Sequence, residues 1–452
     1  MSDPSGHDRM QIPLHRRIAE DLTRQVNEGT LRPGQKLPSE RHIAQEHRAS
    51  RATVRTALGH LEQAGIINRR DRRSAVVTVK RSVTPSVRLA CSSARLLRVF
   101  RELGDMHLLP ARHQVQFVDL QQPGALSQMA AQPTAGADII ICEFEYLRCF
   151  QSQEGFCFPL SAAEFGEAQI APVMSDLFKQ DRTYTAVPLG FSPMILYRNR
   201  LRMGEHALTS GSASPLPWPQ LQETLAKVTT QGQYGLQLRP TFAHLAALMA
   251  SRGLSLYQSD GRINAKDAPI FEKTVRMMHD FLHVTKISPI LAKAEQINLF
   301  AQQRCAVAMD GFDMYPTYRQ SVGHALEIDV LPQSNACSSV TTGFAAVVLP
   351  DAGQPQPAID LVRNLLNTPT QKALYQLSGA LPVRSDLLQL DAIQSLDIPA
   401  KLAHQILKEL YRCRHLNLPG RSEHKSQVEN LFLELWLGLD TIDNLCHRFQ
   451  QL

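Results

Sequence analysis

The sequence predicts an α/β protein of two unequal parts: a small basic domain of helices and one hairpin, then a much larger α/β module. Charge supports this division. Residues 1–81 contain 16 lysines and arginines against 9 aspartates and glutamates, whereas the rest of the chain contains 32 against 33. Length supports it too, because 452 residues with 43% hydrophobic content can fill at least two cores. A basic end on a neutral body indicates a polyanionic partner, most often nucleic acid.

Two classes of protein are excluded early. No apolar run follows the charged residues at the start, as it would in a secretory signal, and no stretch approaches the roughly 18 apolar residues of a membrane span. We therefore expect a soluble, cytoplasmic protein without a membrane partner. The eight cysteines form no C-x-x-C pair and no repeated Cys/His spacing. Free thiols are expected, without a disulfide framework or a metal site.

Two helices are expected first in the basic domain. Apolar residues recur every four positions from Leu14 to Val26, which predicts one apolar stripe along a helix that Gly29 ends. The stretch LRPGQKLPSER then supplies a Pro-Gly turn, followed by Pro38 and Ser39. A proline and a hydroxyl cap in this order predict that a second, short helix begins at Ser39.

A third helix is expected to begin after Ser50, which can cap it in the same way. Apolar residues from Val54 to Leu61 give this helix a buried face. Arg55 points away from that face, and Arg51 lies on its flank. Two short helices joined by a tight turn, the second opening on arginines and small hydroxyls, are typical of a recognition helix that enters the major groove of DNA. Free amides at its start also suit a phosphate.

The segment GIINRRDRRSAVVTVK contains two β-branched runs around a polar tip, and this pattern predicts a hairpin. Its tip region carries Arg69, Arg70, Arg72 and Arg73. Three helices followed by a hairpin make a winged helix-turn-helix. A basic wing commonly contacts phosphates or the minor groove, so we include Arg72 and Arg73 among the DNA-binding candidates.

These residues closely resemble the N-terminal domain of GntR-type bacterial transcription regulators. The shared signature is P-L near the start, G-x-L-x-P-G-x-x-L-P-S-E-R in the middle, and then S-R-x-T-V-R-x-A-L-x-x-L-E-x-x-G. The resemblance implies operator contacts by Arg41, Ser50, Arg51, Thr53 and Arg55. It also implies a symmetric homodimer on a near-palindromic site.

The chain departs from the GntR pattern at three places. Arg48 stands where the family has a glycine in the turn, His15 replaces an aromatic residue, and the wing lacks glycines. The winged-helix fold is expected to accommodate these departures.

After residues 1–80, the polar segment 81–87 is a predicted linker, which leaves 88–452 as a second module. Two kinds of large domain follow the DNA-binding domain in GntR-type regulators. One is an aminotransferase-like domain with pyridoxal phosphate, but Lys286 lacks the sequence that precedes a Schiff-base lysine. The other is a periplasmic-binding-protein-like sensor. A shorter sensor of the sugar-repressor type remains a further alternative.

Seven segments, in the correct order, resemble family 1 extracellular solute-binding proteins. They are SVRLACSS, ADIIICEFEYLRCF, YTAVPLGFSPMILYRN, PLPWPQLQETLAKV, INLFAQQRCAVAMDGF, SVTTGFAAV and LSGALPVR. The third resembles the segment in which such chains cross between lobes. The resemblance implies two α/β lobes, with helices on both faces of each sheet, that close on a ligand.

Candidate ligand residues are those that follow the expected strands: Glu143, Phe144, Tyr146, Phe191, Ser192, Asp310, Gly311, Phe312, Tyr315, Gly343 and Phe344. Aromatic faces stack on sugar rings, and carboxylates accept sugar hydroxyls. The alternative is that the phenylalanines simply pack in the core, as we expect of Trp218 and Trp436. The family tryptophan after A-M-x-x-x-G is absent from DGFDMYP. A monosaccharide, a disaccharide or another small polar metabolite is therefore favoured over a large oligosaccharide.

The sequence as a whole predicts a bacterial transcription regulator that is not an enzyme and uses no cofactor. Ligand closure of the lobes is expected to change the spacing of two DNA-binding domains in the dimer.

Overall fold

The computed structural model describes the chain with gaps. The described residues are 14–27, 30–32, 34–63, 66–71, 74–77, 86–110, 114–118, 136–147, 157–165, 170–180, 182–206, 217–239, 241–254, 268–291, 299–332, 340–350, 355–394, 398, 403, 404, 407 and 422–451. The chain divides into two compact units, residues 1–84 and 85–452. The first strand of unit 2 begins at Ser86, so the last two residues of the segment predicted as a linker, 81–87, belong to that strand.

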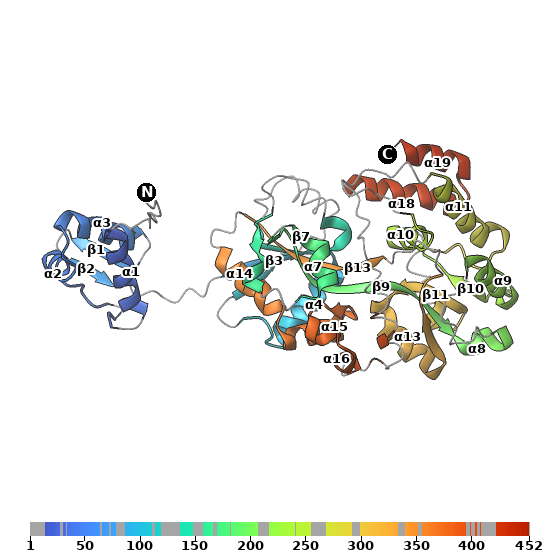
Figure 1. Ribbon diagram of the computed structural model, residues 1–452, viewed down its shortest axis with the longest axis horizontal. Coiled ribbons are helices and arrows are strands. Elements are labelled where there is room, and N and C mark those ends of the chain that lie inside the picture. The colour runs from blue at the N-terminus through green and yellow to red at the C-terminus, as the bar shows by residue number, and fades with distance from the viewer. Residues whose placement is uncertain are drawn as a thin grey trace, which may run out of the picture. The chain divides into compact units, whose positions relative to one another are not determined.

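The described residues of unit 1 form three helices and a hairpin (Figure 1). They are α1 (Leu14–Asn27), α2 (Glu40–Glu46), α3 (Arg51–Gln63), β1 (Ile67–Asp71) and β2 (Ser74–Val77). The two strands pair antiparallel with an irregular register near the tip, and Lys36 forms a further bridge to Val76. The expected helix-helix-helix-hairpin order is confirmed.

The core of unit 1 is small and aliphatic. Ile18 and Leu22 of α1 pack with Ile43 of α2 and with Val54 and the following apolar positions of α3. Leu14, which the four-residue period placed on the same stripe, is instead 41% exposed. A stripe at period four drifts around a helix of 3.6 residues per turn, so its first residue leaves the buried face.

Unit 2 is built on a nine-stranded sheet, in which seven strands follow the order β10-β11-β9-β13-β5-β3-β4 and the other two, β12 and β14, each pair with β9. Its central strand, β9 (Val187–Asn199), has 13 residues, all buried. The first half of β9 pairs with β13 and β14, and the second half pairs with β11 and β12. Figure 1 shows β9 passing from the lobe that contains β3 and α4 to the lobe that contains β10 and β11. The expected crossing segment is therefore confirmed.

The first lobe comprises β3 (Ser86–Cys91), α4 (Ala94–Asp105), β4 (Gln114–Val118), β5 (Ile139–Glu143), α7 (Pro172–Phe178), β13 (Thr341–Val348), α14 (Pro355–Leu365), α15 (Thr368–Ser378) and β14 (Leu381–Pro382). The second comprises α8 (Arg200–Met203), α9 (Trp218–Val228), β10 (Tyr234–Gln237), α10 (Phe242–Ser251), α11 (Ala268–His279), β11 (Cys305–Gly311), α13 (Tyr315–Val322), β12 (Leu326–Asp329), α18 (Ser422–Trp436) and α19 (Ile442–Gln450). Smaller elements are η1 (Phe144–Tyr146), β6 (Leu160–Ser161), η2 (Ala162–Phe165), β7 (Lys179–Gln180), β8 (Thr183–Tyr184), η3 (Gly204–His206), η5 (Asp280–Val284), η6 (Phe312–Met314), η7 (Gly323–Ala325), η8 (Ser385–Leu388) and α16 (Leu390–Gln394).

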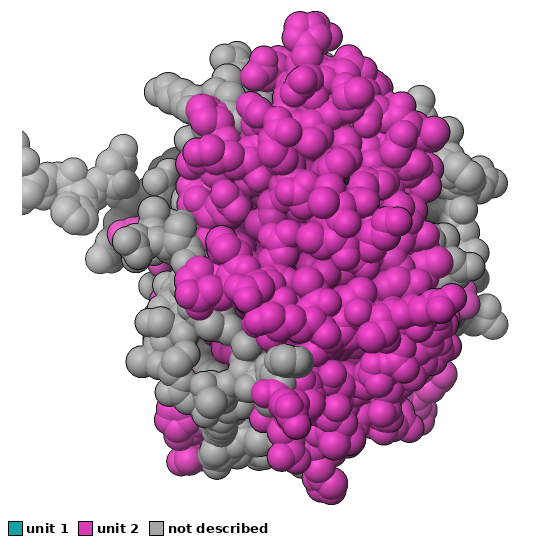
Figure 2. Space-filling model, turned by 90° about the vertical axis from the view of Figure 1, so that its right-hand side faces the viewer, with its two compact units in different colours: residues 1–84 teal, residues 85–452 magenta. Residues whose placement is uncertain are grey.

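Two hydrophobic cores lie on this sheet. One fills the first lobe and continues along β9 to β11 and α13, and the other packs α9, α10, α11, α18 and α19 against β10 and β11. Trp218 and Trp436 are buried in the second core, as expected. Figure 2 shows unit 2 from the side that carries α9 and α19 in Figure 1, where the described residues form a continuous surface. No helix among the described residues is both long and apolar enough to cross a membrane.

Candidate DNA interface and candidate ligand cleft

The two helices of the helix-turn-helix begin at hydroxyl caps. Ser39 accepts a hydrogen bond from the His42 backbone amide at 3.2 Å. Ser50 accepts one from the Thr53 backbone amide at 3.0 Å, and its hydroxyl also lies 2.8 Å from the Thr53 hydroxyl. These caps satisfy amide groups that the first turn leaves unpaired, and they fix where each helix starts.

The predicted DNA-binding side chains share the outer surface of α2 and α3. Arg41, Ser50, Arg51 and Arg55 are exposed, and Thr53 is half-buried beneath the cap. Arg55 forms an ion pair with Glu40 of α2 at 3.5 Å, which joins the starts of the two helices. Arg72 and Arg73 lie outside the described residues, so the wing contacts remain predictions.

Arg48, which stands where the family has a glycine, adopts the backbone conformation of a glycine. It occupies the turn between α2 and α3 with a φ of 48°, in the left-handed region that glycine adopts without steric cost. The chain therefore keeps the turn geometry and carries the strain of a side chain at that position.

The candidate ligand site is a cavity of about 200 Å³ between the lobes of unit 2. Its wall comes from the start of α4, the end of β5, the middle of β9, α10, η6, β13 and the end of α15. The lining residues are Arg95, Leu96, Glu143, Phe144, Glu145, Ser192, Ala243, Ala246, Asp313, Val340, Thr341, Thr342, Gly343, Phe344, Ser378 and Ala380. This wall combines a mainly apolar surface with a few charged and hydroxyl groups, as small-molecule sites do.

A chain of polar contacts crosses the cavity wall at β9. Ser192 donates a hydrogen bond to Asp313 Oδ1 at 2.8 Å and accepts one from the Asp313 amide at 2.9 Å. Arg95 donates to Asp313 Oδ2 at 2.7 Å and to the Ser378 carbonyl at 2.8 Å. Thr342 donates to the Ser192 carbonyl at 3.1 Å. Both lobes thus contribute to one network that faces the cavity.

Glu143 lies at the end of β5, as expected, and its carboxylate is held by hydroxyls at the start of α4. Ser93 donates to Oε1 at 2.6 Å, and Ser92 donates to Oε2. Ser93 also caps α4 by accepting from the Leu96 amide. An anion at a helix start is favoured by the helix dipole. Burial, and to a lesser extent the negative charge of Glu143, raises the pKa of the Cys91 thiol to about 12.

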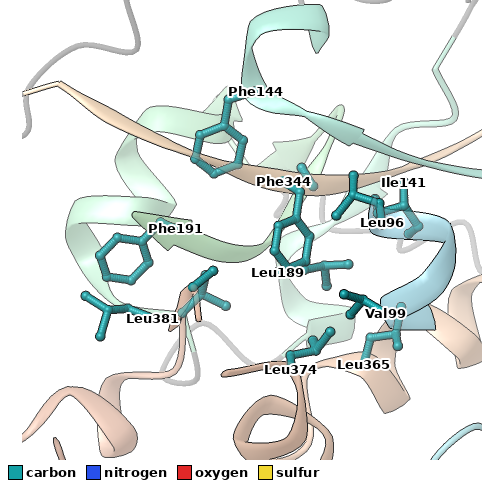
Figure 3. Close-up of a cluster of buried hydrophobic side chains, with 14 of the residues drawn as sticks. Leu96, Val99, Ile141, Phe144, Leu189, Phe191, Phe344, Leu365, Leu374 and Leu381 are labelled. Carbon is teal, nitrogen blue, oxygen red and sulfur yellow. The ribbon is translucent and has the colours of Figure 1, made fainter. Parts of the chain in front are cut away.

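Of the predicted ligand residues, Glu143, Phe144, Ser192, Gly343 and Phe344 line the cavity. Phe144 and Phe344 are only 2% and 4% exposed, and Phe191, at 0%, does not line it. All three belong to one hydrophobic core, and Figure 3 shows Phe344 among leucine and valine side chains, Phe191 beside Leu381 and Phe144 at the edge of the cluster. The three phenylalanine rings therefore lie mostly in the core, which was the alternative to a role in ligand binding.

Asp310 is a buried structural carboxylate in this fold. It is paired with Arg239 and accepts a hydrogen bond from Tyr318 at 2.8 Å. Gln237 donates to the same tyrosine hydroxyl at 2.9 Å. Burial is the largest influence on the pKa values here, lowering that of Arg239 and raising that of Tyr318 to about 12. Asp310 does not line the cavity.

The remaining candidates also lie off the cavity wall. Phe312 and Tyr315 are buried and stacked on one another with ring centroids 5.4 Å apart, and half-buried Tyr146 packs against the first core. Gly311 has a steric role, because a Cβ there would overlap Asp313 Oδ1 and lie 2.6 Å from Ser192 Oγ. Its lack of a side chain makes room for the Ser192–Asp313 hydrogen bond.

Sequence reasoning missed Arg95 and Asp313. A signal for Arg95 existed, since the Ser92-Ser93 pair after the first strand can cap a helix whose first turn faces the strand ends. Asp313 ends the G-x-W position of the family pattern, where this chain has Gly-Phe-Asp. Lys286 is exposed and does not line the cavity. The described residues contain no group of three or more potential metal ligands.

The fold and the two sites define a DNA-binding regulator of the GntR type that is fused to a solute-binding-protein-like domain. Residues 14–77 match the model of the gntR family of bacterial regulatory proteins. Residues 114–400 match the model of the bacterial extracellular solute-binding proteins, and the chain belongs to that family. The expected architecture is confirmed, in place of the aminotransferase alternative.

Similar proteins are known for each part. The HTH-type transcriptional repressor NagR of Bacillus subtilis (strain 168) is 40% identical over 67 residues, which are 15% of this chain and 28% of NagR. The chain thus matches less than a third of that relative's length. Maltose-bound MalE3 of T. maritima aligns with 81% of this chain and 98% of its own, with a TM-score of 0.67 and 12% identity. A solute-binding protein of Thermotoga lettingae bound with α-D-tagatose covers 81% and 97%, with a TM-score of 0.66 and 16% identity.

Proposed function

We propose that this protein is a ligand-responsive bacterial transcription regulator. Its winged helix binds a near-palindromic operator as a homodimer, and its solute-binding-protein-like module senses a small polyhydroxylated molecule in the cytoplasm. The single observation that carries the proposal is the cavity between the lobes, in the same chain as a helix-turn-helix that exposes Arg51 and Arg55. The module serves as a sensor, and we propose no catalytic role for it.

The surface of unit 1 supports DNA binding. The exposed arginines of α2 and α3 provide charge for phosphates and planar donors for base edges, and the start of α3 presents the positive end of its helix dipole. A single recognition helix reads only a few base pairs. Two copies related by a two-fold axis would read two half-sites and give the specificity that a regulator needs.

The cavity supports a small ligand. Its volume of about 200 Å³ is below the range of about 300–1,000 Å³ that is usual for drug-sized ligands. The carboxylates of Glu143 and Asp313 line the cavity and can accept hydrogen bonds from ligand hydroxyl groups. Similar folds are described as bound with maltose, α-D-tagatose and D-mannitol. A mono- or disaccharide, or the related alditol, is the proposed effector class.

Lobe closure is the proposed route from ligand to DNA. A ligand that contacts both lobes favours the closed arrangement by the difference between its affinities for the two arrangements. In a dimer, closure would alter the separation of the two recognition helices, and operator affinity would change accordingly.

Thermal unfolding of the full-length protein tests the sensor. The panel consists of maltose, D-tagatose, D-mannitol and an equal concentration of glycine as a control for a small polar solute. A ligand that binds only the folded protein raises the melting temperature in proportion to ln(1 + [L]/Kd). A rise of several degrees with one sugar and none with glycine is expected. Unchanged melting with every sugar, in protein that still binds DNA, would reject the sugar class.

Sedimentation velocity tests the dimer directly. A homodimer should sediment at about 101 kDa, twice the chain mass of 50.4 kDa. A monomer both alone and on a two-half-site duplex would reject the dimeric arrangement.

A further inference from the structure

We propose that the Arg95–Asp313 ion pair is a ligand-sensitive tie between the lobes. Ligand hydroxyl groups take the place of the Arg95 guanidinium on Asp313, so that the ligand replaces the ion pair at this contact between α4 of the first lobe and η6 of the second. Asp313 is then a ligand-binding carboxylate, and Arg95 is its partner in the empty cleft. The inference rests on the proposed function, because it assigns the residues through which ligand binding is sensed.

Asp313 is the fixed member of the pair. One carboxylate oxygen and the backbone amide of Asp313 are both bonded to Ser192 of β9. Glycines surround it closely, because a Cβ at Gly311 or Gly379 would overlap Asp313 atoms. The side chain is 16% exposed. Its Oδ1 is therefore committed to the fold, and Oδ2 remains the oxygen that an incoming hydroxyl group can reach.

Arg95 is the member that can leave. Its side chain is 60% exposed, and the same nitrogen, Nη2, donates to Asp313 Oδ2 and to the Ser378 carbonyl. Ion pairs with such exposure contribute little, because water screens them and holding a long side chain costs entropy. When Arg95 leaves, water can solvate it. Arg239 cannot readily replace it, because that guanidinium is already paired with buried Asp310.

The pair joins the two lobes of unit 2 at the cavity wall. Arg95 belongs to the first turn of α4, Ser378 ends α15, and Asp313 follows β11, which pairs with the second half of β9. These segments are far apart in the sequence, and all three residues line the cavity. Breaking the pair therefore removes a contact between lobes at the place where a ligand enters.

Isothermal titration calorimetry on the full-length protein tests the exchange. Maltose, D-tagatose and D-mannitol are the probes, and the variants are Arg95→Gln, Asp313→Asn and the control Arg98→Gln, which removes an exposed arginine from the same helix. A probe that binds the wild type should bind Arg95→Gln about twofold to fivefold more tightly, because an exposed ion pair no longer competes. It should bind Asp313→Asn at least about tenfold more weakly, because a charge-assisted acceptor is lost. Arg98→Gln should match the wild type.

Weaker binding by Arg95→Gln would overturn the proposal, because Arg95 would then be a ligand contact and the proposed function would stand. Unchanged binding by Asp313→Asn would also overturn it. If no probe binds the wild type, the sugar class fails instead, and the tie itself is decided by a measurement that needs no ligand.

That measurement is hydrogen exchange of the ligand-free proteins, followed by mass spectrometry. Arg95→Gln should raise the exchange of amides in residues 94–97 and 312–316 relative to both the wild type and Arg98→Gln, because a tie between the two segments is lost. Equal exchange in all three proteins would show that the Arg95–Asp313 pair does not hold these two segments together. Circular dichroism and melting of each variant confirm that it is folded.

Discussion

Tyr318 donates a hydrogen bond to Asp310 at 2.8 Å, and both side chains are buried. The same carboxylate is paired with Arg239, so Asp310 joins β11 to α13 and to the segment after β10. A charge in this position is stable only because its partners are in place. Asp310 does not line the cavity, whereas Asp313, three residues later, does.

Asp310→Asn should therefore destabilise unit 2. The change leaves the buried Arg239 guanidinium without its carboxylate, which typically costs about 3–5 kcal/mol. Urea denaturation monitored by tryptophan fluorescence measures this cost, since Trp218 and Trp436 both lie in unit 2. Glu223→Gln, at an exposed i,i+4 pair with Lys227, is the control and should leave the midpoint unchanged. A wild-type midpoint for Asp310→Asn would contradict the structural role.

Arg48→Gly should stabilise unit 1. The φ of 48° strains an arginine, and relief of that strain, less the extra entropy of glycine in the unfolded chain, should gain about 1 kcal/mol. Residues 1–80 contain no Phe, Tyr or Trp, so the transition must be followed by calorimetry. Gly34→Ala is a matched test of opposite sign, because Gly34 has a φ of 82° and open space around it. If both substitutions lowered the melting temperature, strain at Arg48 would not be the reason.

Arg51→Ala should abolish sequence-specific DNA binding and leave the cleft unaffected. An arginine that reads a base edge contributes about 1–3 kcal/mol of discrimination, whereas one that contacts phosphate changes all sequences alike. Competition between a selected operator and a scrambled duplex, at fixed salt, separates these cases. Arg98→Ala, which removes an exposed arginine from unit 2, should retain the wild-type preference. If Arg51→Ala still discriminated between the operator and the scrambled duplex, the placement of the recognition helix in the major groove would be wrong.

The stability of unit 2 should fall above pH 9. Burial is the main cause that raises the pKa values of Cys91 and Cys305 to about 12, against an ordinary value of 9.0. The folded protein holds these protons more tightly than the unfolded chain, so their contribution is complete below pH 9 and is lost as the pH rises toward 12. The slope should approach about 1.4 kcal/mol per pH unit for each thiol. Cys91→Ala and Cys305→Ala should each make the fall shallower, and an unchanged slope would show that these thiols do not titrate differently on unfolding.

The sequence predicts unit 1 well because its determinants are local. Ser39 and Ser50 cap the helices at the expected positions, and the buried face from Val54 to Leu61 follows the helical period. These features depend on neighbours a few residues away. The crossing strand was identified differently, by the resemblance of YTAVPLGFSPMILYRN to solute-binding proteins, and it is a 13-residue strand buried throughout.

The ligand cleft is less predictable because its members meet through tertiary structure. The rule that ligand residues follow strands selected Glu143 and Ser192, which line the cavity, but also Phe191 and Asp310, which are buried and do not line it. All four lie within β5, β9 or β11, and not after these strands as expected. Pattern alone does not say which face a helix or a longer strand will cover. Arg95 was overlooked because it lies on a helix whose first turn reaches the cleft only after α4 has packed on its sheet.

The affinity for DNA in the presence and absence of ligand tests the central claim most directly. The operator is first selected in vitro from random duplexes, and the full-length protein is then titrated by fluorescence anisotropy with and without the sugar that raises its melting temperature. Allosteric coupling of about 1–3 kcal/mol should change the operator affinity about fivefold to 150-fold, and the operator should change the sugar affinity by the same factor. Identical operator affinity at saturating sugar would contradict the account, because the cleft would then bind a ligand without informing the DNA-binding domain.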